Sequence, residues 1–340
     1  MDAEPDKAQD GGTPQAGGRL TMADLARLAG VSKITVSRAL ADSPLVRPEL
    51  RARVQELARQ HGYRLNLSAR SLRLQQRNVI AVVLEMDPSP DRPMSDPYPL
   101  ELLGGICQEL TTAGYNVLLT PRQGIESPAV QGADGIILLG QGSHNDAARQ
   151  LGHAHVPLVV WGAKRPGRSH VVVGSDNRRG GASAAERLLS LGRRRAVFLG
   201  DTSHPEIDQR CKGFEAALKA GGGALVAKLP SVFTFAAGST AVNGLLDRGE
   251  AFDGLFAASD LLAMGAVRAL LDRGLAVPDA VSVIGYDDIP LAACFTPPLT
   301  TIHQDWHAGG VLLARKVRAL VEGEETDSAV LPTRLVVRGT

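Results

Sequence analysis

The chain has 340 residues, of which 44% are hydrophobic and 21% are charged. This length allows two or three domains, and the composition is that of a soluble globular protein rather than a disordered or membrane-spanning one. No apolar run reaches the length of a membrane span. The three cysteines, Cys107, Cys211 and Cys294, match no zinc or CxxC spacing. We therefore expect reduced, semi-buried thiols and a cytoplasmic location.

The net charge of +1 conceals a strongly basic module near the N-terminus. Residues 19–77 contain twelve Lys or Arg and only four Asp or Glu, a net charge of +8. Residues 1–18 are acidic and rich in Gly and Pro, which predicts a disordered tail and no signal peptide. Basic charge concentrated in one small module is typical of a phosphate-binding surface, whereas a merely solvated helical face usually mixes both signs.

The segment 20–40 has the pattern of two short helices joined by a tight turn. Thr21 and Asp24 form a capping box at the start of the first helix, and Gly30 is expected to break it. Its apolar face comprises Ala23, Leu25, Ala26, Leu28 and Ala29.

The second helix is predicted to run from about Lys33 to Leu40, with Ser32 as its cap. Its inward stripe comprises Val36, Ala39 and Leu40, and its polar residues are Lys33, Thr35, Ser37 and Arg38. A helix this short is not stable alone, so the packing beneath it must present its polar face. A helix-turn-helix places its recognition helix in the DNA major groove in this way. Periodicity alone leaves an ordinary helical hairpin with a solvated basic face as the alternative.

A third helix is expected from Pro48 to Gly62, with Tyr63 packing back on the bundle. The segment 66–78 is too polar and too short to be a stable isolated helix. We expect it to be a linker that becomes helical when it has something to bind.

From Val79 onward, short apolar runs alternate with helical segments. The candidate strands are residues 79–86, 116–120, 135–140, 157–162, 170–174, 196–200, 254–259 and 281–287, with a terminal strand in 331–339. Continuous apolar runs fit strands buried on both faces of a parallel sheet covered by helices. Eight strands exceed one compact unit, so two similar α/β lobes are predicted.

Several strings occur in a specific order and spacing between Leu20 and Gly339. They include MADLARLAGVSKITVSRAL, NLSARSLR, ADGIILLG, RCKGFEAAL and the run from FAASDLLAMG to GYDDIPLAACFTPPLTTIHQ. In these strings the chain resembles the lactose-repressor/galactose-repressor (LacI/GalR) family of bacterial transcription regulators. The resemblance implies an N-terminal all-α helix-turn-helix headpiece, a hinge, and an α/β core. In that core, two periplasmic-binding-protein-like lobes with parallel sheets are joined by three crossovers.

The resemblance also implies domain boundaries. They are a tail at 1–18, a DNA-binding domain at 19–65, a hinge at 66–77, and an effector-binding and dimerisation core at 78–340. The first lobe would comprise about 78–173 and 305–330, and the second about 174–304 and 331–340. Ligands of such lobes bind at the carboxyl ends of the strands, in the cleft between the lobes.

The family's DNA contacts map onto the second helix. Lys33, Ile34 and Arg38 match positions that reach base edges: lysine and arginine suit guanine O6 and N7, and Ile34 suits a thymine methyl. Positions that fix the helix to phosphates are matched by Ser32, Thr35 and Ser37. The alternative for Arg38 is a structural surface arginine.

In the hinge, Leu72 matches the leucine that similar proteins wedge into the centre of the operator. An apolar side chain in a short basic segment can enter a widened minor groove and kink a base step. Arg70 and Arg73 would offset phosphate repulsion. The alternative is a linker leucine that packs on the core.

Two residues match the family's polar ligand contacts: Arg210, whose fork suits hydroxyls or carboxylates, and Asp287, which can accept two hydroxyl hydrogen bonds. Asp287 could instead be a turn residue. The other positions assigned to the cleft are Tyr98, Trp161, Phe233, Ser259 and Gln304. Ser259 replaces the usual asparagine, and Gly162 replaces an aspartate of some sugar-responsive members. Both changes remove polar partners, which implies a ligand that is smaller, differently polar or absent.

The sequence is thus interpreted as a homodimeric, ligand-responsive transcription regulator, a repressor that binds a palindromic operator. No cofactor or metal is expected, because His153 and His155 lack a third ligand. One alternative is a solute-binding protein with the same core, against which the headpiece and the missing secretion signal argue. The other is an α/β enzyme, against which the absence of GxSxG, HExxH, Walker A and complete GxGxxG motifs argues.

Overall fold

The computed structural model describes residues 20–63, 77–86, 96–142, 146–152, 156–164 and 170–340. They belong to two compact units, which divide between Gln75 and Gln76. The predicted tail, most of the predicted hinge with Leu72, Arg70 and Arg73, and the pair His153 and His155 lie outside the described residues. Within the described part, no helix is long and apolar enough to cross a membrane.

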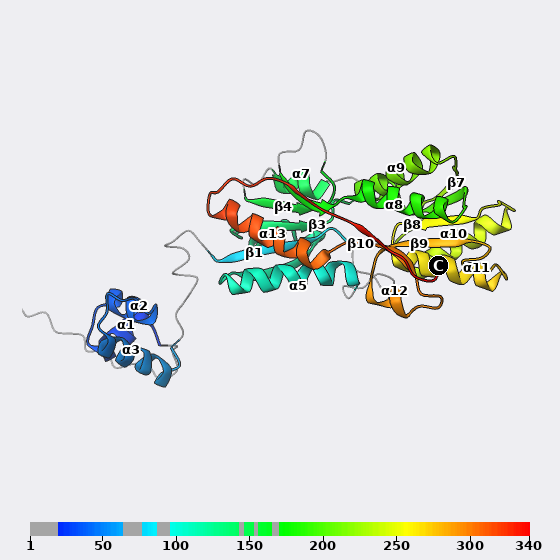
Figure 1. The fold of residues 1–340 in the computed structure, drawn as a ribbon. Helices are drawn as coiled ribbons and strands as arrows, with labels where there is room; N and C mark the ends of the chain where they lie inside the picture. The colour runs from blue at the N-terminus through cyan, green and yellow to red at the C-terminus, as the bar shows by residue number, and fades with distance from the viewer. Residues whose placement is uncertain (1–19, 64–76, 87–95, 143–145, 153–155, 165–169) are drawn as a thin grey trace, which may run out of the picture. The chain divides into compact units, whose positions relative to one another are not determined.

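The described part of the N-terminal unit contains three helices, α1 (Met22–Ala29), α2 (Lys33–Leu40) and α3 (Pro48–Gln60), as the sequence predicts (Figure 1). Both sides of the Thr21–Asp24 capping box are formed, Gly30 ends α1 with a φ of 67°, and Ser32 caps α2. The shared core comprises Leu25, Ala26, Ala29, Val36, Ala39, Val46, Val54 and Ala58, with Tyr63 packed against it. The prediction for Ala23 and Leu28 is wrong, because both are exposed on α1.

The first lobe of the second unit contains a six-stranded parallel sheet in the order β11-β5-β4-β3-β1-β2. Its strands are β1 (Val79–Leu84), β2 (Asn116–Pro121), β3 (Gly135–Leu139), β4 (Leu158–Trp161), β5 (Val171–Ser175) and β11 (Ala329–Leu331). Its helices are α5 (Pro97–Thr112), the 3-10 helix η1 (Arg122–Gly124), α6 (Pro128–Gln131), α7 (Asp146–Gly152) and α13 (Trp306–Val321).

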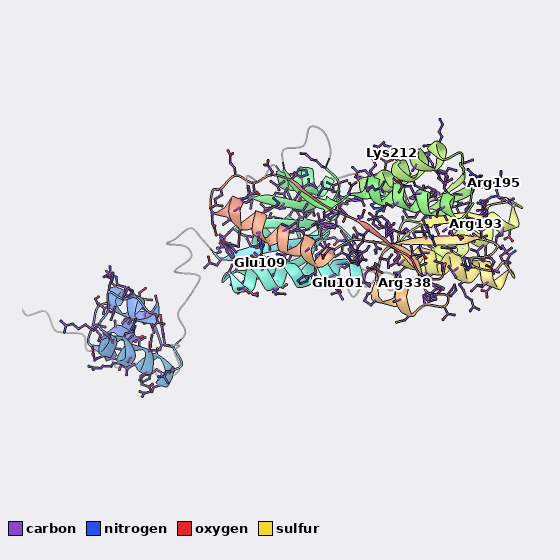
Figure 2. All side chains as sticks on the ribbon, in the orientation of Figure 1. Glu101, Glu109, Arg193, Arg195, Lys212 and Arg338 are labelled. Atoms are coloured by element: carbon purple, nitrogen blue, oxygen red, sulfur yellow. The ribbon has the colours of Figure 1, made fainter. Side chains whose placement is uncertain are left out.

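Helices cover both faces of this sheet, as continuous apolar strands require. Alternate residues of β1 belong to two different clusters: Ile80 and Val82 pack with residues of α5 and α13, and Ala81 and Val83 with residues of α6 and α7. Helices α5 and α13 also pack on each other, where Glu109 accepts hydrogen bonds from the Arg315 guanidinium at 3.1 and 3.3 Å (Figure 2).

The second lobe contains a sheet in the order β12-β10-β9-β8-β6-β7. Its strands are β6 (Arg195–Leu199), β7 (Ala224–Leu229), β8 (Gly254–Ala257), β9 (Ser282–Asp287), β10 (Thr300–His303) and β12 (Arg334–Val336). Its helices are α8 (Asn177–Ser190), α9 (Pro205–Ala220), α10 (Phe235–Asp247), α11 (Asp260–Asp272) and α12 (Pro290–Cys294). The pair α8 and α9 packs on one face of the sheet and the pair α10 and α11 on the other (Figure 1).

The chain passes between the lobes three times: from β5 to α8, from β10 to α13, and from β11 to β12. The terminal strand predicted within 331–339 is present as β12, which runs antiparallel to β10 in the second sheet. The prediction missed β11, which precedes it and joins the first sheet. The prediction also missed β7 and β10, since β7 is a half-exposed edge strand of mixed polarity and β10 reads TTIH.

Candidate DNA interface and ligand cleft

Helix α2 presents the three residues predicted to contact bases on its outer face. Lys33, Ile34 and Arg38 are exposed, and Ile34 keeps 60% of its surface accessible. Val36 and Ala39 are fully buried beneath them, so packing on α1 and α3 fixes which face of α2 points outward. This is the presentation expected of a recognition helix.

The residues predicted to bind phosphates lie at the start of α2 and along its side. The Ser32 hydroxyl accepts the Thr35 backbone N–H at 3.1 Å, and the two hydroxyls are 2.9 Å apart. One hydroxyl of the pair donates to the other, which leaves one O–H to donate elsewhere. Ser37 is half-buried on the same helix.

The cations of the headpiece fall into two sets. Arg27, Arg51 and Arg59 each form an ion pair within the unit. Within the described part of the chain, the side chains of Lys33 and Arg38 have no hydrogen bond or ion pair, and the same holds for the exposed Arg47 and Arg53. Unpaired cations around α2 leave its outer face electropositive, which favours a polyanionic partner.

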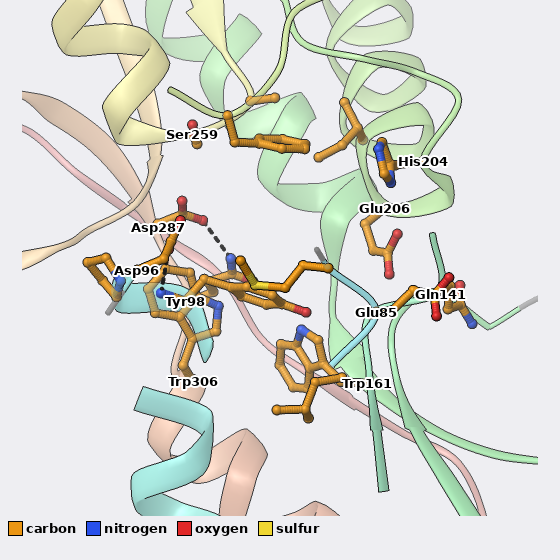
Figure 3. A pocket seen from close by; sticks show the side chains of 18 of the residues that line it. Glu85, Asp96, Tyr98, Gln141, Trp161, His204, Glu206, Ser259, Asp287 and Trp306 are labelled. Atoms are coloured by element: carbon orange, nitrogen blue, oxygen red, sulfur yellow. Dashed lines mark hydrogen bonds between the residues drawn. The ribbon is translucent and has the colours of Figure 1, made fainter. Parts of the chain in front are cut away.

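In the second unit, all seven residues predicted to bind effector line one cavity of about 120 Å³ between the lobes (Figure 3). They are Tyr98, Trp161, Arg210, Phe233, Ser259, Asp287 and Gln304. A single water needs about 10–15 Å³ measured in this way, so the cavity is large enough for a small organic ligand. Ligation by these residues remains a prediction.

Arg210 and Asp287 form the polar centre of this cleft. The Arg210 guanidinium donates to Asn177 Oδ1 at 2.8 Å and to the Ala258 carbonyl at 2.6 Å, and lies 3.6 Å from the centre of the Tyr286 ring. Its Nη1 atom is 3.9 Å from Asp287 Oδ1. Protein groups therefore hold the guanidinium in place and use part of its donor capacity.

Asp287 ends β9 in an unusual backbone conformation. Its φ is 117° and that of Asp288 is 62°, in the region that normally favours glycine. Such strain persists only where the surroundings impose it, and it is concentrated at functional sites. Here Asp288 is held by the Arg338 guanidinium at 2.6 Å and by the His303 ring at 3.0 Å, so the C-terminal segment helps to fix the backbone next to Asp287. Burial raises the pKa of Asp287 well above its ordinary value.

Gln304 connects the two lobes at the cleft. Its side-chain amide donates to Asp287 Oδ1 at 2.7 Å and accepts the Ser175 hydroxyl at 2.8 Å. Ser175 ends β5 of the first lobe and Asp287 ends β9 of the second. The amide is buried, so moving either lobe away would leave a buried polar group without a partner.

The position of Gly162 shows why no aspartate stands there. A Cβ on this glycine would lie 2.5 Å from Gln141 Cδ and 2.8 Å from Glu206 Oε1. The Gln141 side chain is fixed against the glycine, since its amide donates to the Ala163 carbonyl and accepts the Ala163 N–H. Gln141 from the first lobe and Glu206 from the second thus place polar groups where a side chain at position 162 would otherwise lie.

Aromatic side chains form the remaining walls. Tyr98 and Trp306 meet edge to face with centroids 5.7 Å apart, and His204 and Phe233 do so at the same separation. Trp161 lies against Gly309 of α13, where a larger residue would collide with its ring. Ser259, whose hydroxyl accepts the Leu262 N–H at 3.4 Å, also caps α11.

Sequence reasoning missed several lining residues. The polar and aromatic ones are Glu85, Asp96, Gln141, His204, Glu206 and Trp306. The carboxyl-end rule could have identified Glu85 and Gln141, because each follows an apolar strand closely. Glu206 lies in the first turn of α9, and nothing in its local sequence indicates that it reaches the opposite lobe. Among the described residues, no group of three His, Cys, Asp or Glu is placed to hold a metal ion.

Comparison with known proteins identifies this combination of units. Residues 21–66 match the family described as bacterial regulatory proteins, lacI family, and residues 185–340 match a periplasmic binding protein-like domain. The chain is 34% identical to the HTH-type transcriptional regulator CelR of Thermobifida fusca, over 94% of this chain and 98% of that protein. This chain belongs to the lacI family. Another relative is the ribose operon repressor of Escherichia coli strain K12, which is 31% identical over 84% of this chain and 88% of the repressor.

Solved structures of lacI-family proteins share the architecture. The Lac repressor dimer bound to operator and the anti-inducer ONPF has a TM-score of 0.86 at 24% identity, covering 95% of this chain and 99% of that one. The CelR–cellobiose complex has a TM-score of 0.68 at 31% identity, covering 94% and 99%. A solved relative from Enterococcus faecium, with bound ribose, has a TM-score of 0.66 at 28% identity, covering 77% and 97%. The predicted fold class, a helix-turn-helix headpiece with a two-lobed α/β core, is confirmed.

Asp260, at the start of α11, fixes the backbone two residues after Asp287. Its buried carboxylate accepts the Ile289 N–H at 2.9 Å and the Thr301 hydroxyl at 2.5 Å, and burial raises its pKa to about 7. This value exceeds the ordinary 3.8, so the folded state holds the proton more tightly than the unfolded chain does. The stability that the protonated Asp260 contributes is therefore fully present below about pH 3.8 and is lost as the pH rises to about 7.

We predict that Asp260→Asn reduces the loss of unfolding free energy that the wild type shows between about pH 4 and 7, because asparagine cannot ionise. Chemical denaturation at several pH values measures this slope. The exposed Asp279→Asn is the control and should keep the wild-type slope. A wild-type slope in Asp260→Asn would show that Asp260 does not titrate in this range.

Proposed function

We propose that this protein is a sequence-specific transcription regulator, a repressor, whose affinity for its operator is controlled by a small polar effector. The observation that carries the proposal is the presence in one chain of two features. One is a helix-turn-helix whose second helix exposes unpaired cations, and the other is a two-lobed core with a polar cleft. Its lacI-family relatives bear the names of regulators and repressors, which supports a regulator over a solute-binding protein or an enzyme.

Each residue of α2 has a chemically distinct role in this proposal. Lys33 and Arg38 donate to guanine O6 and N7, and Ile34 contacts a thymine methyl. Ser32, Thr35 and Ser37 contact phosphates, which orient the helix without specifying sequence. One headpiece reads half a site, so the protein acts as a homodimer on a palindromic operator in the cytoplasm.

The hinge keeps the role that the resemblance to the family gives it. Leu72 enters the minor groove at the operator centre, and Arg70 and Arg73 neutralise nearby phosphates. The boundary proposed from the sequence between this segment and the core, after residue 77, lies two residues beyond the division of the structure between Gln75 and Gln76.

The cleft favours a neutral, hydroxyl-rich effector of carbohydrate type. Its described lining includes four carboxylates, those of Glu85, Asp96, Glu206 and Asp287. Carboxylates accept hydrogen bonds from hydroxyls but repel anions, and the guanidinium of Arg210 is already shared with protein acceptors. The aromatic walls suit the apolar faces of a sugar ring. CelR with cellobiose and the Enterococcus faecium relative with ribose give two first probes.

We predict that Arg38→Ala lowers affinity for a site selected by the wild type from random DNA by about 1–3 kcal/mol, with non-specific binding nearly intact. Binding titrations on selected and random duplexes measure both. Arg27→Ala, which removes an arginine paired with Asp24 on α1, should bind as the wild type does. Equal losses on both duplexes would assign Arg38 to phosphate.

We also predict that Asp287→Ala abolishes the effector response but preserves operator binding, because it removes a cleft acceptor and leaves the headpiece unchanged. Thermal-shift screening of neutral sugars, sugar acids and nucleobases identifies the effector, since binding to the native state raises its stability. The matched control is Asp279→Ala, at an exposed site of the same lobe. Full effector response in Asp287→Ala would mean that the residue is only a turn residue.

A further inference from the structure

A buried asparagine at the start of α8 holds the edge of the Arg210 guanidinium. Asn177 is 2% exposed, and its Oδ1 atom accepts the Arg210 Nε–H at 2.8 Å and the Tyr286 hydroxyl at 3.3 Å. The guanidinium carbon lies 3.6 Å from the centre of the Tyr286 ring. Asn177 therefore fixes the edge of the guanidinium and also bonds the residue that covers its face.

This arrangement leaves part of the guanidinium to the cleft. Nε donates to Asn177 and Nη1 donates to the Ala258 carbonyl at 2.6 Å, whereas Nη2 has no hydrogen bond among the described residues. A guanidinium carries its N–H donors in a rigid planar fork, so fixing Nε also fixes the direction in which the Nη2 donors point. The position of Asn177 Oδ1 thus decides which way the remaining donors of Arg210 face.

Asn177 is also attached to the segment that passes between the lobes. It is the first residue of α8 and follows Ser175, the last residue of β5, by two positions. Its Nδ2 donates to the Ser175 carbonyl at 3.0 Å, and the Ser175 hydroxyl donates to Gln304 Oε1 at 2.8 Å. One side-chain amide therefore connects the Arg210 guanidinium to the crossover between β5 and α8.

Two glycines of α8 make this close fit possible. A Cβ on Gly180 would lie 2.7 Å from the Tyr286 hydroxyl oxygen, and a Cβ on Gly181 would overlap the Arg210 carbonyl oxygen. Glycine destabilises a helix interior relative to alanine, so close approach to β9 and α9 is the physical reason for glycine at both positions. The first turns of α8 are thus shaped around the two residues that Asn177 joins.

We propose that Asn177 is a positioning residue of the effector site, which acts through Arg210. Its Oδ1 directs the Nη2 donors toward an oxygen of the bound effector, and its Nδ2 ties that direction to the crossover between the lobes. Hydrogen bonds weaken steeply as their angle departs from linear, so a guanidinium that loses this support binds the effector less tightly. The inference rests on the proposed function, because it requires an effector that contacts Arg210.

A double-mutant cycle on the full-length protein tests this role. The probe is the neutral sugar that raises the unfolding temperature of the wild type most, with cellobiose and ribose screened first, and calorimetry measures its Kd. Asn177→Ala should weaken binding about 10-fold, the factor that a hydrogen bond to a charged group contributes. In an Arg210→Lys background, which has no Nε–H to hold, Asn177→Ala should weaken binding no further. Asn177→Asp keeps an oxygen at the Oδ1 position and should bind nearly as the wild type does.

The matched control is Asn243→Ala. Asn243 Oδ1 also accepts an arginine Nε–H, that of Arg273 at 3.1 Å, but neither residue lines the cleft. This variant should leave the Kd of the sugar unchanged. Thermal unfolding without sugar verifies that each variant folds. If Asn177→Ala does not fold, Asn177→Ser takes its place, because its shorter side chain does not reach Arg210.

Three outcomes overturn the inference and leave the proposed function standing. They are an unchanged Kd in Asn177→Ala, an equal loss of affinity with Arg210 and with Lys at position 210, and a Kd for Asn177→Asp as weak as that for Asn177→Ala. The second outcome is the one expected of a merely structural asparagine, whose removal lowers stability without acting through the guanidinium. A wild type that binds no neutral sugar overturns the proposed effector class, and the inference with it.

Discussion

The buried amide of Gln304 is the interaction on which the proposed mechanism depends. It joins the end of β5 in one lobe, through Ser175, to the end of β9 in the other, through Asp287. Leaving a buried polar group without its partner costs about 1–3 kcal/mol, so the relative position of the lobes is tied to this bridge. An effector that donates to Asp287 Oδ1 must share this atom with the Gln304 amide or displace that amide. Effector occupancy and lobe geometry are therefore linked.

The hydrogen bonds around Asp287 and Asp288 explain why the cleft tolerates backbone strain at these two residues. Asp287 and Asp288 both have positive φ, which costs of the order of 1–3 kcal/mol each. Asp260 bonds the Ile289 N–H on one side, and Arg338 bonds Asp288 on the other. These surrounding bonds impose the conformation and place the Asp287 carboxylate at the cleft before any ligand arrives. Prior placement of an acceptor reduces the ordering that binding must pay for.

Local sequence predicted the parts of the structure that depend on local physics. The capping box, the end of α1 at Gly30 and the buried stripe of α2 follow from neighbouring residues, and continuous apolar runs predicted most buried strands. The edge strand β7 was missed because its burial pattern is weak. Glu206 was missed for another reason, since its place beside Gly162 arises only when two lobes meet across a glycine that lacks a Cβ. The cleft residues assigned from the resemblance to the family all line one cavity. Gln141 and Glu206, the polar residues beside Gly162, could be identified only from the structure.

Both tryptophans of the chain, Trp161 and Trp306, line the cleft, so their fluorescence reports directly on effector binding. The most direct test measures the effector's Kd from this signal, in free protein and in protein saturated with operator. Since binding free energies are reciprocal, the account predicts that operator changes the effector's Kd by the same factor by which effector changes the operator's Kd. A saturable effector titration with the same Kd in both states would contradict the coupling between cleft and headpiece.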